Sequence, residues 1–217
     1  MRILIEVPTY DGRISQATSE SLWRLDRCGH DVDYKPRTGY GCAMARNRIA
    51  ADALNARYDY VLMVDNDIAL PRDALANLLE HGADVAMGYY LNRYARGESR
   101  LTTAYKADAG GWKMYEASEL RELRDQGATA VPVKGGGMGC ALIRADVFRR
   151  VEFPWFEWKD IDFDEYFAPS AYECTDKFQS GGEDIEFCIK CRRAGVEMVV
   201  DPRVACGHEF REVKWPE

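Results

Sequence analysis

The sequence predicts an α/β fold in which a mostly parallel sheet is wound with helices. Through residues 1–90, short apolar runs alternate with helix-like segments, as they do in strand–helix–strand units. The clearest run, residues 60–64, is almost wholly apolar, as expected of a strand that is buried on both faces. It ends in Asp65-Asn66-Asp67, at the place where open α/β sheets bind ligands.

The other expected elements follow the same alternation. In the first half we predict strands over residues 3–7, 32–34 and 85–88, and helices over residues 15–28, 43–56 and 71–82. In the second half we predict an edge strand over 102–106, strands over 140–143 and 197–200, and helices over 117–125, 145–150 and 183–194. Asp201-Pro202 is expected to form a turn after the last of these strands.

Two stretches lack a regular pattern. Four of the five residues 135–139 are glycine, which indicates backbone that another part of the molecule approaches closely. Residues 155–172 are dense in aromatic and acidic side chains, and the aromatics either stack on a sugar or base or cover the core. We expect the segment 157–182 to act as a lid that is less ordered without a donor molecule.

Composition limits the classes of protein and partner. The 217 residues predict a single domain without internal linkers. A net charge of −7 argues against nucleic-acid binding, and no apolar stretch is long enough to span a bilayer. With no signal peptide after Met1 and an odd count of seven cysteines, we expect a cytoplasmic protein. Cys188 lies at helical spacing with apolar neighbours, which favours a core position over a structural zinc site.

The carboxylates after residues 60–64 are candidate metal ligands. Side chains alternate along an extended chain, so Asp65 and Asp67 can point the same way. Two hard oxygen donors suit Mg²⁺ or Mn²⁺, with phosphate oxygens and water completing the shell. The same residues also suit a plain strand end that leads into a turn and a helix.

Further motifs join this one in a set order along the chain. Gly182-Glu183-Asp184 opens a predicted helix, and His208 follows a short strand near the end. Taken alone, Asp184 suits a helix N-terminus and His208 suits an ordinary hydrogen-bonded polar residue. Together with Val7-Pro8-Thr9-Tyr10 and Ala45-Arg46-Asn47, these motifs make the chain resemble the GT-A-fold glycosyltransferases of the family 2 type, over nearly its whole length.

This resemblance implies an enzyme that moves a sugar from a UDP- or GDP-sugar to an acceptor hydroxyl. It implies a GT-A-type Rossmann-like sheet, with a nucleotide-binding half over residues 1–90 and a smaller acceptor-side half over 91–217. The resemblance assigns Asp65, Asp67 and His208 to a divalent metal, Mn²⁺ or Mg²⁺. It assigns Asp184 as the catalytic base of an inverting enzyme, with Glu183 as its partner in the acidic pair. The nucleotide is assigned to Thr9, Tyr10, Asp11, Arg46 and Asp65.

Some features leave alternatives open. The acidic turn that holds the base in such enzymes has no clear match at residues 34–37, and the acceptor is not identified. Residues 135–153 and 195–208 also resemble retaining mannosyltransferases of the same fold. A sugar nucleotidyltransferase shares the sheet and the metal, but it would carry a glycine-rich phosphate loop where this chain has Pro8-Thr9-Tyr10. A non-catalytic nucleotide-sugar-binding module is the third alternative, and it would be expected to lack one of the acids.

Overall fold

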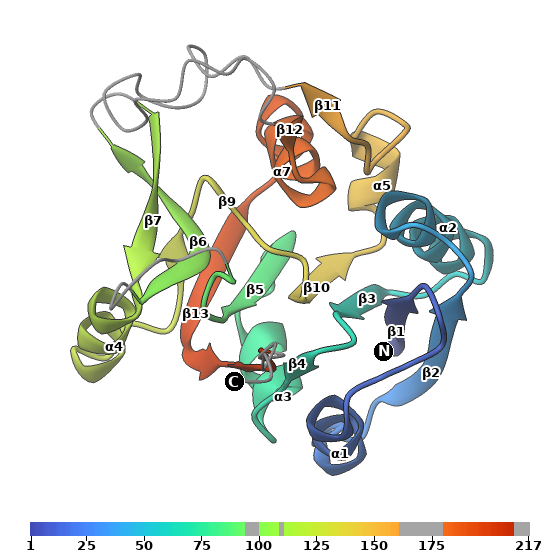
Figure 1. The fold of residues 1–217 in the computed structure, drawn as a ribbon, viewed down its shortest axis with the longest axis horizontal. Helices are drawn as coiled ribbons and strands as arrows, with labels where there is room; N and C mark the ends of the chain where they lie inside the picture. The colour runs from blue at the N-terminus through green and yellow to red at the C-terminus, as the bar shows by residue number, and fades with distance from the viewer. Residues whose placement is uncertain (94–99, 109–110, 161–179, 211–217) are drawn as a thin grey trace, which may run out of the picture.

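A computed structural model describes residues 1–93, 100–108, 111–160 and 180–210 of the chain (Figure 1). Its centre is a seven-stranded sheet whose strands lie in the order β2 (Asp31–Thr38), β1 (Arg2–Thr9), β3 (Tyr60–Val64), β10 (Cys140–Arg144), β5 (Val85–Tyr89), β13 (Met198–Ala205) and β8 (Val131–Pro132). Only β10 and β8 run antiparallel to their neighbours. The mostly parallel sheet is therefore confirmed, and strands from both halves of the chain build it.

Helices cover both faces of this sheet. The described residues form α1 (Gln16–Arg24), α2 (Cys42–Asn55), α3 (Ala74–Glu80), α4 (Ala117–Asp125), α5 (Val147–Arg150) and α7 (Glu183–Arg193). Val61 and Met63 of β3 pack in one core cluster with α2, α5 and α7, while Leu62 and Val64 pack in another with α3. A strand between two such layers has no solvent face, which explains why β3 is apolar along its length. None of the described helices is long and apolar enough to cross a membrane.

Smaller pairings complete the fold. A second sheet has the order β7 (Gly111–Glu116), β6 (Leu101–Asp108) and β9 (Gly135–Gly136), and it lies beside α4 (Figure 1). Two short ladders join β4 (Ile68–Ala69) to β14 (Gly207–His208), and β11 (Lys159–Asp160) to β12 (Ser180–Gly181). The predicted close approach at the glycine run is present, because a Cβ on Gly135 would lie 2.8 Å from the Trp112 ring.

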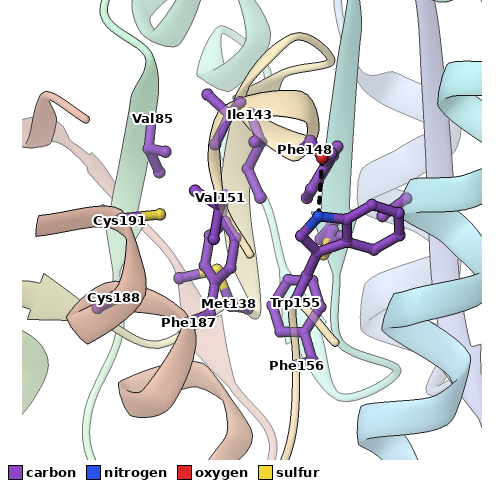
Figure 2. Close-up of a cluster of buried hydrophobic side chains, with 14 of the residues drawn as sticks. Val85, Met138, Ile143, Phe148, Val151, Trp155, Phe156, Phe187, Cys188 and Cys191 are labelled. Carbon is purple, nitrogen blue, oxygen red and sulfur yellow. Dashed lines mark hydrogen bonds between the residues drawn. The ribbon is translucent and has the colours of Figure 1, made fainter. Parts of the chain in front are cut away.

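The first aromatic residues of the 155–172 stretch belong to the core (Figure 2). Trp155 is buried and its Nε1 donates a hydrogen bond of 2.8 Å to the carbonyl of Phe148. Phe156 stacks on Phe187 of α7, with ring centroids 4.5 Å apart. Cys188 is fully buried beside them, as its spacing predicted. Most of the proposed lid, residues 161–179, lies outside the described residues.

Several predicted boundaries are wrong, and tertiary contacts explain the differences. The strand expected over 32–34 extends over all of β2, because it pairs with β1 from Arg2↔Asp31 to Thr9↔Thr38. Its proline is tolerated because β2 is an edge strand. The expected turn at Asp201-Pro202 lies inside β13, where the buried Asp201 carboxylate is within 2.8 Å of His81 Nε2. Helix α1 ends at residue 24 rather than 28, and β7 was not predicted.

Gly88 in β5 provides a test of this packing. An added Cβ would lie 2.7 Å from Cγ1 of Val204 and 2.8 Å from Sγ of Cys140, so neighbouring strands would have to move. Overpacking of this kind typically costs about 1–3 kcal/mol. We expect Gly88→Ala to lower the free energy of unfolding, measured by urea denaturation, by that amount. Gly41→Ala is the control, since a Cβ there meets nothing within 4 Å and φ is −62°. Equal stability of the two variants would contradict the prediction.

Candidate active site

The buried side of the site is an arginine held between two carboxylates. Arg46, from α2, donates from Nη2 to Oδ1 of Asp65 at 2.6 Å and from Nη1 to Oε1 of Glu183. The side chains of Arg46 and Glu183 are only 3% and 7% exposed. Glu183 is the first residue of α7, and Asp65 directly follows β3. The ion pairs therefore fix the start of α7 against the end of β3.

The second carboxylate of the motif, Asp67, lies in a separate cluster with His208 and Arg93. The β4–β14 ladder pairs His208 with Ile68, which brings the late histidine beside the Asp65–Asp67 turn. Nδ1 of His208 lies 2.7 Å from the Leu91 carbonyl, so in the neutral ring Nδ1 carries the proton and Nε2 is an acceptor. Arg93 Nη2 donates to Asp67 Oδ2 and lies 3.2 Å from His208 Nε2.

The charges of this cluster shift the pKa values of its members. Burial alone would raise the pKa of Asp67, but His208 and Arg93 outweigh it and hold that pKa below its ordinary value. Burial alone would lower the pKa of His208, whereas the Asp67 carboxylate and the Leu91 carbonyl raise it above its ordinary value. Asp67 is therefore a carboxylate that stays ionised through the neutral range.

Asp184 faces the open side of the site. It follows Glu183 at the start of α7, and its Oδ1 accepts a hydrogen bond of 2.8 Å from the backbone N–H of Ile185. A helix N-terminus favours a low carboxylate pKa. Here burial raises the pKa of Asp184 to about 6, and the negative charge of Glu183 adds to this effect. A carboxylate of that pKa is a better proton acceptor than a solvated one.

These groups meet in one cavity of about 440 Å³. Its wall includes Asp65, Asp67, Tyr90, Trp158, Asp184 and His208, with Glu183 beside them. Thr103, on β6, also lines the cavity, and its Oγ1 is buried with no hydrogen-bond partner among the described residues. A polar atom in that position is available to a ligand hydroxyl.

A neighbouring cavity of about 330 Å³ lies on the other side of Asp67 and is lined by Asp11, Arg13 and Arg93, among others. The loop after β1 forms part of its wall. Thr9 Oγ1 donates to the Arg13 carbonyl at 3.0 Å, and Nδ2 of Asn66 donates to the same carbonyl at 2.8 Å. These bonds hold the loop onto the Asp65–Asp67 turn.

The structure brings most of the predicted residues together. Asp65, Asp67, Glu183, Asp184 and His208 line one cavity, and Asp11 lines the next. Tyr10 is 77% exposed close by. The predicted contact of Arg46 with the nucleotide stays a prediction, because the guanidinium of Arg46 is engaged by two carboxylates.

Sequence reasoning missed some residues of the site. Arg93 and Arg13 contribute positive charge, and Tyr90 contributes an aromatic wall. Trp158, which also lines the cavity, belongs to the aromatic stretch 155–172 for which stacking on a sugar or base was one expectation. Arg93 lies in an Arg-rich polar segment that matches no motif. The only sequence signal was the excess of arginine after residue 90, which does not indicate which arginine reaches the site.

The residues as placed do not fit a divalent metal. The described part of the chain holds no group of three or more His, Cys, Asp or Glu side chains arranged to bind one. One oxygen of Asp65 is bonded to Arg46, while Asp67 and His208 both contact Arg93. The metal assignment of Asp65, Asp67 and His208 therefore stays a prediction.

Comparison with solved structures identifies the fold. A197 from STIV matches with a TM-score of 0.61 and 17% identity, over 97% of this chain and 87% of A197. GalNAc-T7, solved with UDP, GalNAc and Mn²⁺, matches with a TM-score of 0.51 and 12% identity, over 96% of this chain and 44% of its own. No family model and no curated protein matches the sequence. The fold is of the GT-A type, as the resemblance in the sequence predicted.

The arginine between the two carboxylates can be tested by a double-mutant cycle. Arg46→Met should lower the free energy of unfolding by about 3–5 kcal/mol, since it leaves the buried Glu183 and the partly buried Asp65 without their cation. Glu183→Gln in the same chain should recover part of that loss, because it removes one of the uncompensated charges. Urea denaturation of the four proteins measures both effects. Strictly additive losses would contradict the coupling.

Proposed function

We propose that this protein is a glycosyltransferase that moves a sugar from a UDP- or GDP-sugar to an acceptor hydroxyl with inversion at the anomeric carbon. The observation that carries the proposal is the single cavity into which Asp65, Asp67, Asp184 and His208 converge from three parts of the chain. The cavity lies at the carboxyl end of β3, where open α/β sheets bind ligands. A sugar transfer needs acidic side chains in different surroundings, because they have different roles in the reaction.

The donor side is assigned to residues 1–90. In the proposal the nucleotide lies against Thr9, Tyr10 and Asp11 after β1, and its diphosphate lies beside the arginines of the neighbouring cavity. GalNAc-T7, which has this fold, was solved with UDP and Mn²⁺, and this supports a nucleotide and a cation as ligands in the proposal. In this chain Mn²⁺ or Mg²⁺ would have to displace Arg93 from Asp67 and His208. The cation beside the diphosphate is therefore either the metal or Arg93.

The acceptor side is assigned to residues 91–217, with Asp184 as the general base. As the acceptor oxygen bonds to the anomeric carbon, its proton passes to the Asp184 carboxylate. The bond from the anomeric carbon to the phosphate oxygen breaks, and its electron pair leaves with the nucleoside diphosphate. Attack from the face opposite the leaving group inverts the anomeric centre. Glu183 is unsuited to this role because Arg46 holds its carboxylate, and it positions the start of α7 instead.

Incubation with a panel of UDP- and GDP-sugars, with and without Mn²⁺, tests the proposal. A glycosyltransferase commonly hydrolyses its donor slowly and releases a nucleoside diphosphate. A sugar nucleotidyltransferase would instead release pyrophosphate from a nucleoside triphosphate and a sugar phosphate. A binding module would be stabilised against thermal unfolding by a nucleotide sugar but would release nothing. The last two results would each overturn the proposal.

Substitution of the base should separate chemistry from binding. We expect Asp184→Asn to lose about 10²–10⁴-fold in the rate of transfer, the usual contribution of a general base. Donor binding, measured by calorimetry, should change little, because the amide keeps the shape of the carboxylate. Glu183→Gln is the comparison variant and should be less damaging to the rate. A larger loss in Glu183→Gln, or retention seen by NMR of the product's anomeric centre, would contradict the assignment.

The raised pKa of Asp184 predicts the pH dependence of the reaction. The base acts in its ionised form, which is lost as the pH falls below the pKa of about 6. We expect kcat/KM to be level above this pH and to fall about tenfold per pH unit below it. The pH profile of donor turnover measures this. Asp184→Asn is the control, since the pH profile of its residual activity should lack that inflection. A pH profile of the parent with its midpoint near pH 4 would contradict the prediction.

A further inference from the structure

Arg93 occupies the position in which two of the predicted metal ligands would bind their ion. Its Nη2 donates to Oδ2 of Asp67 and lies 3.2 Å from Nε2 of His208. Those two acceptor atoms are 3.7 Å apart. A magnesium ion bound by both would lie about 2.1 Å from each of the two atoms that Nη2 of Arg93 already contacts. The ion and the guanidinium therefore compete for the same two acceptor atoms.

The backbone that carries Arg93 is fixed in the described residues. Leu91 forms a bridge with Thr102, and the Asn92 N–H donates 2.8 Å to the carbonyl of Leu101 in β6. The Leu91 carbonyl also holds Nδ1 of His208 at 2.7 Å. The stretch of chain that precedes Arg93 therefore also holds the ring of His208.

The third predicted ligand, Asp65, is already paired with a buried arginine, and among the described residues it forms no three-ligand group with Asp67 and His208. Asp65 is bonded through Oδ1 to Arg46, which also holds Glu183. Moving Asp65 toward Asp67 would break an ion pair with a buried arginine, which is costly. An ion would be left with one carboxylate and one imidazole from the protein, and it would have to expel a cation that already satisfies both.

Arg93 has the exposure and the donors to bind a diphosphate. Its side chain is 52% exposed and lines both cavities, on either side of Asp67. Its contacts with described residues use Nη2 alone, so Nη1 and Nε can face a ligand. A guanidinium presents five N–H donors in a planar fork that matches phosphate oxygens. Arg13 lines the neighbouring cavity and adds a second positive charge.

We propose that Arg93 is the resident cation of this site, held by Asp67 and His208 against the donor diphosphate, and that transfer requires no divalent metal. This inference rests on the proposed glycosyl transfer. As the bond from the anomeric carbon to the phosphate oxygen breaks, the electron pair leaves on that oxygen, and the N–H groups of Arg93 stabilise the growing negative charge. No proton or electron moves through the arginine. Asp67 and His208 are then positioning residues for it.

Activity and nucleotide binding without metal form the first test. In EDTA, the parent should turn over its best UDP- or GDP-sugar within about twofold of its rate in Mn²⁺. Arg93→Met, which replaces the aliphatic stem of the side chain and removes its charge and its donors, should lose about 10²–10³-fold, as loss of a transition-state hydrogen-bond donor does. Calorimetry with UDP and GDP in EDTA should show binding by the parent that weakens in Arg93→Met. Arg24→Met, an exposed arginine on α1, is the matched control and should match the parent.

Binding of Mn²⁺ alone gives a readout that is independent of activity. If Arg93 blocks Asp67 and His208, removing it should create a metal site. We therefore expect Arg93→Ala to bind Mn²⁺ more tightly than the parent does, as measured by electron paramagnetic resonance of the free ion. Asp67→Asn added to Arg93→Ala should abolish that gain. Thermal unfolding verifies that the variants fold. We expect them to fold, because the side chain of Arg93 is largely exposed.

The outcomes separate this inference from the proposed function. A parent that is active only with Mn²⁺, or an Arg93→Met variant as active as the parent in EDTA, would overturn the role of Arg93 and leave glycosyl transfer standing. Equal Mn²⁺ binding by the parent and Arg93→Ala would also overturn it. A parent that neither binds nor turns over any nucleotide sugar, with or without Mn²⁺, would overturn both.

Discussion

The buried guanidinium of Arg46 is the interaction on which the site depends. It joins three elements that are distant in sequence, since α2 supplies the arginine, β3 leads into Asp65 and α7 begins with Glu183. A buried charge without a partner is unfavourable by several kcal/mol, so each carboxylate stays where the arginine holds it. The orientation of α7 is fixed as a result. Adjacent helical residues point about 100° apart, so Glu183 turns inward while Asp184 faces the cavity.

The balance of charge at the site explains the rest of its chemistry. Four carboxylates gather here, and the Nη1 and Nη2 atoms of Arg46 pair with two of them. At Asp184 the negative charge of Glu183 outweighs the positive charge of Arg46, and it adds to burial in raising the pKa of Asp184. A donor diphosphate would bring more negative charge to the same place. A cation beside Asp67 would offset that charge, and Arg93 already forms an ion pair with Asp67 there.

The sequence predicted the sheet well and the site in part. Strand β3 was recognisable because burial on both faces leaves an apolar run, and that pattern does not depend on distant contacts. The full lengths of strands with a weaker hydrophobic pattern were not recognisable from the sequence. Strand β2 pairs with β1 through polar residues, and β13 continues through Asp201-Pro202. In each case a neighbouring strand or a buried side-chain contact decided the conformation. The local sequence alone favoured a shorter strand or a turn.

By itself the sequence determined the mostly parallel sheet wound with helices, the position of Asp65 and Asp67 at a strand end, and the helix that starts at Glu183. These features follow from hydrophobic period and from local turn and helix-start chemistry. The tertiary structure alone decided which charges meet. Arg93 contacts partners 26 and 115 residues away, and Arg46 reaches one 137 residues away. Pairings over such separations depend on how strands are ordered in the sheet, and no local pattern encodes that order.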